Sequence, residues 1–211
     1  LQYFNNFLSL SINLKQCCKF FIYSMKIKLL KFKKVKSTND IAIKLIKKDL
    51  LKPTLIFSEQ QTKGRGTMGK KWISSKGNLF LSILFLINSK KINYKQFALL
   101  NAYLIKRILS KFILKKINIK WPNDLLIDKK KVCGILQELI YHKEKSFLVI
   151  GVGINTFSSP SISNFETSSL QKYTKKRINN NQILKDIKKT YELFVKDIGK
   201  YGFTYLKRKY K

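Results

Sequence analysis

The sequence predicts a single α+β domain in which helices flank a mixed, mostly antiparallel sheet. Strand-like and helix-like segments alternate along the 211 residues, and no internal repeat is present. Two strand-like runs in the second half are joined by a short polar turn, which is typical of antiparallel pairing. About 45% of the residues are hydrophobic and 13% are aromatic, so the chain can bury one continuous core.

The first half of the chain is expected to form three strands and two helices. Residues 29–35, 54–61 and 77–87 have the apolar patterns of strands, and the last of these is apolar enough for a buried position. Residues 37–51 begin with four consecutive residues of N-cap type and continue with apolar residues at helical spacing. Residues 93–112 have the 3.6-residue period of a long helix.

The second half is expected to supply the antiparallel strands and a helical tail. Residues 117–128 form a strand-like segment that a proline interrupts. Residues 129–142 and 145–156 are two further strands of a meander. A serine-rich loop over 158–174 then leads into a helical tail over 181–210.

The charge balance is strongly basic, with 44 Lys plus Arg against 11 Asp plus Glu and a formal net charge of +33. Such an excess can indicate an anionic partner such as nucleic acid or a membrane surface. The charge is nearly all lysine and is spread along the whole chain. A compositional bias of the source therefore explains the charge as well as a binding face would.

The three cysteines and the single histidine limit which metal sites the chain could form. Cys17, Cys18, Cys133 and His142 do not have the spacing of zinc ligands, so we expect no metal site built from thiols or imidazole. This cysteine usage favours a reducing compartment, and hence a cytoplasmic location. No stretch approaches the roughly 20 apolar residues that span a bilayer, so no membrane association is expected.

The beginning of the chain differs from the rest. The sequence starts with leucine, and Met25 directly precedes the first coherent pattern. We therefore expect residues 1–24 to be an upstream or non-native extension, and residues 25–211 to form the domain.

The segment KGRGTMGKKW, residues 63–72, has the composition of an anion-binding loop. Its glycines would let a ligand approach main-chain amides, and its lysines add charge for a polyphosphate. Arg65 offers a planar fork for a carboxylate or a phosphate. Trp72 could stack on a flat group or simply seat the loop on the core. Taken alone, the segment fits a solvated basic turn as well.

The segment KWPNDLLIDKKKVCGILQEL, residues 120–139, places an acid and a base close together. A tight turn at residues 128–130 would fold Lys131 back toward Asp124. A lysine that enters an apolar strand needs an anion to meet, and Gly134 leaves room for a ligand beside that strand. The alternative is an ordinary ion pair between neighbouring strands, which contributes little when exposed.

The segment VIGVGINT, residues 149–156, is the third candidate. Its two glycines leave one side of a strand bare, and Asn155 can bond a base edge or a carboxamide. Alone, this pattern is better explained as a bulge followed by a turn asparagine.

Together with an upstream STND, these three segments resemble the catalytic domain of biotin protein ligases in order and spacing. The resemblance runs from about residue 26 to the C-terminus. It implies a fold similar to class II aminoacyl-tRNA synthetases and to the biotinyl/lipoyl ligases. It further implies that biotin and ATP give biotinyl-5′-adenylate, and that biotin then passes to a lysine of a carboxylase carrier domain.

The resemblance also implies roles for individual residues. The biotin site would comprise Ser37, Thr38, Asn39, Gln61, Arg65, Gly66, Thr67, Lys131 and Gly134. The ATP and adenylate site would comprise Lys70, Trp72, Asn123 and Asn155. Lys131, Arg65 and Asp124 would be catalytic, and Mg²⁺ would arrive with ATP and lie near Asp124. Thr67 stands where many relatives carry a second arginine, and Lys63 or Lys70 could supply that charge.

Some expectations concern partners and alternatives. Too few residues precede the matching region for the DNA-binding domain of regulatory relatives, so no DNA partner is expected. The family's small C-terminal β domain is expected to be missing from the sequence. A homodimer is left open. Two other functions stay under consideration. One is a lipoate–protein ligase or octanoyltransferase, although those relatives lack the GRG loop and the KWPND form. The other is a basic nucleic-acid-binding protein, which only the net charge supports.

Overall fold

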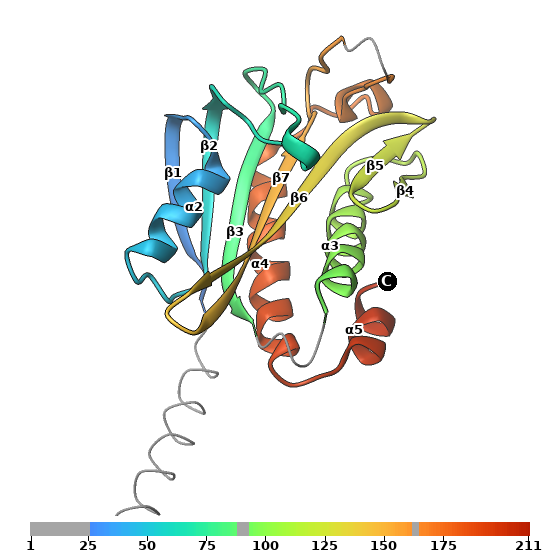
Figure 1. Cartoon of the computed structure of the whole chain (residues 1–211). Coiled ribbons are helices and arrows are strands. Elements are labelled where there is room, and N and C mark those ends of the chain that lie inside the picture. Colours follow the sequence, from blue (N-terminus) through green and yellow to red (C-terminus); the bar gives the residue numbers. More distant parts are fainter. Residues whose placement is uncertain (1–25, 88–92, 162–164) are drawn as a thin grey trace, which may run out of the picture.

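A computed structural model describes residues 26–87, 93–161 and 165–211 of the chain (Figure 1). The expectation for residues 1–24 lies outside the described residues. The strands are β1 (Lys28–Val35), β2 (Thr54–Gln61), β3 (Leu79–Ile87), β4 (Asn118–Lys120), β5 (Asp124–Ile127), β6 (Lys130–His142) and β7 (Lys145–Ile154). The helices are α2 (Thr38–Lys47), α3 (Tyr94–Leu109), α4 (Asn180–Ile198) and α5 (Phe203–Tyr210).

The strands form one seven-stranded sheet with the order β1-β2-β3-β7-β6-β5-β4. β1 and β2 are parallel, and the other neighbouring pairs are antiparallel. The prediction of a mixed, mostly antiparallel sheet flanked by helices is therefore confirmed. Parallel pairing of β1 with β2 requires a crossover, and α2 is the helix that makes it.

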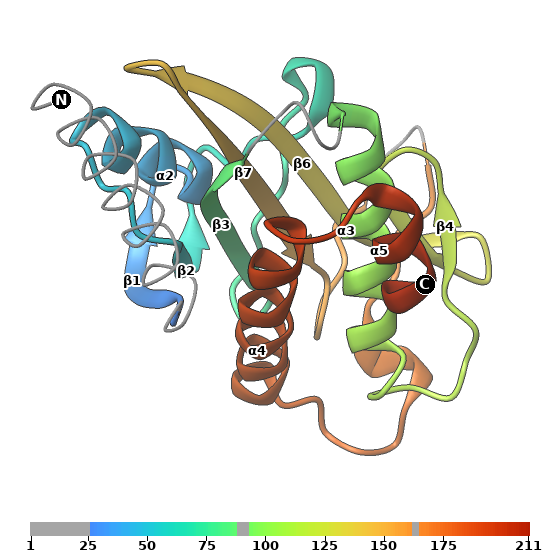
Figure 2. The ribbon, with the colours of Figure 1, turned by 90° about the horizontal axis from the view of Figure 1, so that it is seen from below.

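Helices cover both faces of the sheet (Figures 1 and 2). α3 and α4 pack on one face over the larger apolar core, and α2 covers a smaller core on the opposite face. Alternate residues of β3 enter the two cores, since Ile83 and Phe85 belong to the larger one and Leu84 to the smaller. This two-sided burial explains why residues 79–85 are apolar almost throughout.

The helical tail is two helices and not one continuous segment. α4 ends at Ile198, and α5 begins after residues 199–202, which include two glycines. α5 folds back so that the Tyr210 ring meets the Phe194 ring edge-on at 5.3 Å. The Tyr210 hydroxyl donates to Asp197 at 2.6 Å, which anchors the second helix on the first.

Two turns in the second half lie where the sequence indicated. The Trp121–Pro122 peptide bond is cis, and this proline separates β4 from β5 as expected. Asp128 and Lys129 have φ of 47° and 64° and make the tight turn that joins β5 to β6. The serine-rich loop contains a short 3-10 turn, Leu170–Tyr173.

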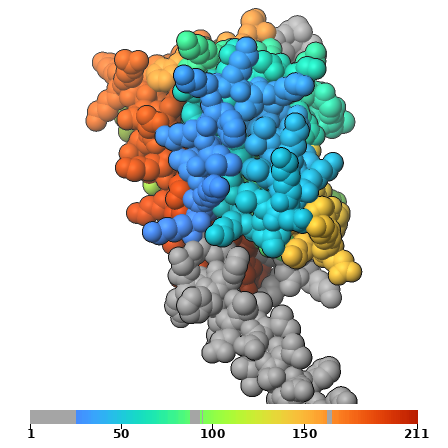
Figure 3. Space-filling view, turned by 90° about the vertical axis from the view of Figure 1, so that its left-hand side faces the viewer, coloured from blue at the N-terminus to red at the C-terminus, as the bar shows by residue number. Residues whose placement is uncertain are grey.

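β1 forms one edge of the sheet and lies on the face shown in blue in Figure 3. Lys28, Lys31, Lys33 and Lys34 are exposed along this strand. Lysines on an edge strand oppose pairing with another sheet, which gives part of the basic excess a structural explanation. Within residues 26–87, 93–161 and 165–211, no helix is both long and apolar enough to cross a membrane.

Candidate functional site

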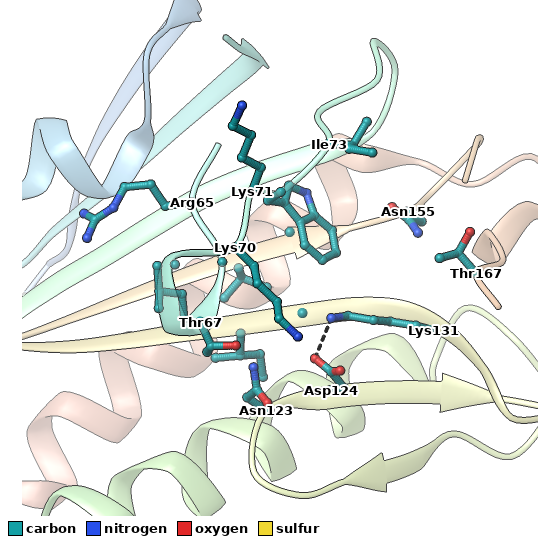
Figure 4. Close-up of a pocket in the computed structure, with 18 of the residues that line it drawn as sticks. Arg65, Thr67, Lys70, Lys71, Ile73, Asn123, Asp124, Lys131, Asn155 and Thr167 are labelled. Atoms are coloured by element: carbon teal, nitrogen blue, oxygen red, sulfur yellow. Dashed lines mark ion pairs between the residues drawn. The ribbon is translucent and has the colours of Figure 1, made fainter. Parts of the chain in front are cut away.

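A cavity of about 720 Å³ lies where the 63–72 loop meets β6, β7 and the start of α2 (Figure 4). This volume is in the range of sites for small molecules and cofactors. The cavity brings together all of the site residues that the sequence pointed to: Ser37, Thr38, Asn39, Gln61, Arg65, Gly66, Thr67, Lys70, Trp72, Asn123, Asp124, Lys131, Gly134 and Asn155. Segments that lie far apart in the chain therefore share one site, while the roles of these residues stay predictions.

The start of α2 forms a polar end of the cavity. Ser37 caps the helix, because its hydroxyl accepts from the Asp40 amide at 3.4 Å. The Thr38 amide donates to Gln61 Oε1 at 2.8 Å, and the Thr38 hydroxyl reaches the same oxygen at 3.1 Å. Gln61 Nε2 in turn donates to Ser74 at 3.2 Å. The helix start is thus tied to β2 and to the segment after the loop.

Asn39 is buried at this polar end and is held on both sides of its amide. Asn39 Nδ2 donates to Glu138 Oε2 at 2.6 Å, and the Ser82 hydroxyl lies within hydrogen-bond reach of Asn39 Oδ1 and of Thr38 Oγ1. Because a carboxylate can only accept, Glu138 fixes which end of the amide faces it. Gly151 leaves the space that the Asn39 side chain fills.

Sequence reasoning missed Ser82 and Glu138. Ser82 interrupts the otherwise apolar β3 and is fully buried there, and Glu138 follows Gln137 between apolar residues of β6. A polar residue in such a position needs a hydrogen-bonding partner, so this interruption was the signal that could have found them.

The 63–72 loop is a small hairpin. Its arms are joined by hydrogen bonds from the Trp72 amide to the Gly64 carbonyl at 2.9 Å and from the Gly66 amide to the Lys70 carbonyl at 2.7 Å. Met68 and Gly69 at the tip have φ of 54° and 72°.

The indole of Trp72 seats this hairpin on the sheet. A Cβ on Gly134 would lie 2.6 Å from the ring, and a Cβ on Gly153 would lie closer still. Both glycines are therefore required by the close approach of the ring to β6 and β7. Of the two roles proposed for Trp72, seating the loop on the sheet is visible in the structure.

Two buried polar atoms of cavity-lining residues lack partners in the described part of the chain. They are Trp72 Nε1 and Asn155 Oδ1, while Asn155 Nδ2 donates to the Ser168 carbonyl at 3.2 Å. A buried donor and a buried acceptor without partners are costly, and both residues line the cavity. They can bond a ligand that offers an acceptor and a donor of its own.

Lys131 and Asp124 form an ion pair inside the cavity, with Nζ and Oδ1 2.8 Å apart. Their side chains are only 16% and 20% exposed. The ammonium also lies 5.3 Å from the ring centres of Trp72 and Phe165. The prediction that the 128–130 turn folds Lys131 toward Asp124 is confirmed (Figure 4).

A β-bulge directs Lys131 into the cavity. Leu125 pairs with Cys133 but Leu126 pairs with Lys131, so Val132 is an extra residue on β6. The extra residue shifts which side chains of β6 face each side of the sheet. Val132 and Cys133 therefore both belong to the larger apolar core. Lys131 then shares the cavity face with Gly134.

The loop after β7 completes the surroundings of Lys131, which the sequence did not reveal. The Lys131 amide donates to the Glu166 carbonyl, and the Ser168 amide donates to the Lys131 carbonyl, both at 2.9 Å. These bonds place Phe165 and Thr167 at the cavity wall. No local pattern in a serine-rich segment announces pairing with a strand about 35 residues earlier.

Arg65, which the resemblance made catalytic together with Lys131, contacts other residues of the chain in the structure. Its guanidinium points away from Lys131 (Figure 4) and pairs with Asp40 at 3.0 Å and with Glu138 at 2.6 Å. Burial alone would lower the pKa of Arg65, but Glu138 and Asp40 together raise it above its ordinary value. Two protein carboxylates therefore already neutralise this charge. Lys70 instead extends toward Lys131 and Asp124 in Figure 4.

Neither the thiol nor the carboxylates of the described residues make a metal site. Burial raises the pKa of the Cys133 thiol, so it stays protonated in the core. No group of three or more His, Cys, Asp or Glu in the described chain could hold a metal ion. Asp124 is engaged by Lys131, and Glu166 pairs with Lys130 at 3.1 Å. A resident Mg²⁺ site does not fit this arrangement, so Mg²⁺ is expected only as the counter-ion of ATP.

Comparison with known proteins finds a matching family and several similar ligases. The sequence profile of the Biotin/lipoate A/B protein ligase family matches residues 31–155, more than half of the chain. The Bifunctional ligase/repressor BirA of Bacillus subtilis (strain 168) is 29% identical over 177 residues, which cover 81% of this chain and 54% of the relative. The Biotin--[acetyl-CoA-carboxylase] ligase of Paracoccus denitrificans is 28% identical over 127 residues, or 59% of this chain and 52% of the relative. The chain thus spans about half the length of these curated relatives.

Solved structures confirm the expected fold class. The biotin protein ligase from Aquifex aeolicus in complex with biotin and ATP has a TM-score of 0.71 and 29% identity, and the match covers 87% of this chain and 77% of that chain. A lipoate protein ligase from Thermoplasma acidophilum has a TM-score of 0.57 and 10% identity over 82% of this chain and 84% of that chain. The second likeness shows the shared fold alone.

Gly153→Ala tests the seating of the loop. The new methyl group would overlap the Trp72 ring, so the ring and the loop must move outward. In a Trp121→Phe background, which leaves Trp72 as the one tryptophan, we expect red-shifted emission and stronger quenching by acrylamide. Gly202→Ala is the control, because a Cβ there meets no atom within 4 Å. Identical spectra for the two variants would contradict the described seating.

Proposed function

The chain belongs to the Biotin/lipoate A/B protein ligase family, and from that premise we propose that it is an ATP-dependent biotin–protein ligase. It would join biotin to ATP as biotinyl-5′-adenylate with release of pyrophosphate, and then transfer the biotinyl group to a lysine of a carboxylase carrier domain. The observation that carries the proposal is one cavity with a hydrogen-bonding end at Thr38 and Asn39 and a cationic end at Lys131.

The polar end suits the ureido ring of biotin. That ring offers two N–H donors and one carbonyl acceptor, and the start of α2 offers hydroxyl, amide and main-chain groups already fixed by Gln61, Ser82 and Glu138. Preorganised groups lose little freedom on binding, which favours affinity. Apolar residues of the same cavity, including Leu81, Ile135 and Val152, suit the hydrocarbon chain.

The cationic end suits the first reaction step. A biotin carboxylate oxygen would attack the α-phosphorus of ATP, and the bond to the β-phosphate oxygen would break as pyrophosphate leaves. Both reactants are anions, so their approach is unfavourable without positive charge. Lys131 is mostly withdrawn from water, where its charge acts more strongly, and Lys70 extends toward the same place.

The adenine would lie between the indole of Trp72 and Asn155. Trp72 Nε1 and Asn155 Oδ1 have no partners in the described chain, and adenine presents both acceptors and an amino donor. Trp72 also forms part of the loop that covers the cavity, so nucleotide binding and loop seating would share one side chain.

In the second step the acceptor lysine, as a neutral amine, would attack the carbonyl carbon of the adenylate, and AMP would leave. The amine must first lose a proton. Asp124 is the carboxylate that supports this role, since it lies at the cavity beside Lys131 and is largely withdrawn from water.

The other two functions have less support. A lipoate ligase shares the fold at 10% identity, which is no evidence for a lipoyl substrate. Nucleic-acid binding still rests on net charge alone, and part of that charge lies on the β1 edge, where it opposes pairing with another sheet. The carrier protein as partner and the cytoplasmic location stay predictions.

The decisive experiment is incubation of the chain with labelled biotin, MgATP and a carboxylase carrier domain. We expect label on the carrier and pyrophosphate exchange into ATP that biotin stimulates and lipoate does not. Pyrophosphate exchange that lipoate stimulates and biotin does not would favour a lipoate–protein ligase. Nucleic-acid binding that weakens with salt, together with no pyrophosphate exchange on addition of biotin or lipoate, would favour the nucleic-acid-binding protein.

Lys131→Ala should remove most adenylate formation. Loss of the ammonium leaves two anions and Asp124 in one partly buried cavity, so we expect pyrophosphate exchange to fall about 1000-fold. Lys130→Ala is the matched control on the same strand, since that side chain is half-exposed and pairs with Glu166 instead. A Lys131→Ala rate near that of the control would refute the assignment.

Asp124→Asn should chiefly slow the second step. An amide cannot take up the acceptor proton, so we expect transfer from purified adenylate to fall about 100-fold. Adenylate formation, followed separately by pyrophosphate exchange, should fall much less. An unchanged transfer rate would rule out this role for Asp124.

A further inference from the structure

The tip of the 63–72 loop has few polar contacts with the rest of the molecule. Hydrogen bonds of residues 66–71 in the described chain lie within the hairpin itself. Arg65 precedes this segment, and its guanidinium leaves the hairpin and pairs with Asp40 on α2 and Glu138 on β6. Trp72 seats one arm of the hairpin. The base of the other arm is held by the Lys63 amide, which donates to the Lys36 carbonyl at 2.8 Å, and Arg65 fastens that arm nearer the tip.

Glu138 serves both this fastening and the polar end of the cavity. Its Oε1 accepts from Arg65 Nη2 at 2.6 Å, and its Oε2 accepts from Asn39 Nδ2 at 2.6 Å. The side chain is only 19% exposed, less than half the value of Asp40 at 41%. A single carboxylate therefore joins the hairpin arm to a buried residue of the cavity wall.

We propose that Glu138 is a positioning residue that couples closure of the 63–72 loop to the orientation of Asn39. It acts through Arg65 and Asn39 and does not itself line the cavity. Its consequence for catalysis rests on the proposed function, because the loop would retain the adenylate until the acceptor lysine arrives. The fastening itself is a property of the protein without ligands.

The chemistry of the contact calls for a carboxylate. Arg65 and Asn39 both present N–H donors, and glutamate meets them with two acceptor oxygens. A glutamine of the same shape would turn its amino group toward one of these donors, so one of the two bonds would be lost. Asp40 holds the same guanidinium from the other side at 3.0 Å, but the carboxylate that accepts from Asn39 Nδ2 is that of Glu138.

The first test is made without substrates, on the full chain. Hydrogen exchange of peptides that cover residues 63–72 should be about tenfold faster in Glu138→Gln than in the wild type. Asp186→Asn is the control, since it removes one carboxylate of another ion pair, with Lys111 at 3.4 Å, on α4. Equal exchange in Glu138→Gln and the wild type would overturn the fastening.

The second test measures release of biotinyl-5′-adenylate from the enzyme. Glu138→Gln and Arg65→Ala should each raise the dissociation rate constant about tenfold, and the double variant should release no faster than the faster single variant. The KM for biotin should rise in Glu138→Gln, through Asn39, but much less in Asp40→Asn. Multiplicative effects of the two substitutions would show that they act independently and would overturn the coupling.

The two tests separate the proposals. Faster exchange in Glu138→Gln together with a wild type that forms no adenylate would retain the fastening and reject the ligase function. A wild type that forms adenylate, with release unaltered by Glu138→Gln, would retain the function and reject the coupling. If Glu138→Gln does not fold, Arg65→Lys replaces it, because a lysine keeps the charge but lacks the planar fork whose two nitrogens meet Asp40 and Glu138.

Discussion

The site depends on one lysine ammonium that is kept largely out of water. A charge in that position is costly unless it has a partner, and Asp124 supplies one at 2.8 Å. Several features of the fold serve this pair: the tight turn that returns β6 beside β5, the bulge at Val132, and the chain after β7 that pairs with Lys131. The rings of Trp72 and Phe165 enclose it further. Because the surroundings are part apolar, the charge of Lys131 stays effective toward an anion that enters the cavity.

The second constraint is the fit of an aromatic ring to bare strands. Trp72 lies where Gly134 and Gly153 leave no side chain, and this contact carries the loop to the cavity. The same ring presents an N–H without a partner in the described residues, and the Asn155 carbonyl oxygen in the same cavity also lacks one there. Rigid packing on one side and free bonding capacity on the other let one side chain both support the loop and receive a ligand.

The sequence revealed those parts of the fold and site that are decided locally. The 128–130 turn could be predicted because its geometry involves a few consecutive residues, and the pairing of Lys131 with Asp124 follows from it. Motif resemblance located the cavity residues but not their contacts. The partners of Arg65 come from α2 and β6, so only the fold brings them within reach. The break between α4 and α5 was missed because residues 199–202 have helical patterns on both sides, and the two glycines there were the available signal.

The bulge at Val132 has a consequence for how this region can vary. It determines which residues of β6 face each side of the sheet. The ammonium of Lys131 faces the cavity, while Val132 and Cys133 face the helices. Loss of one residue there would rotate the lysine into the hydrocarbon interior under α3. Exchanges of one side chain for another do not change which side of the sheet each position faces. The number of residues between Asp128 and Gly134 is therefore more tightly constrained than their identities, apart from the lysine itself.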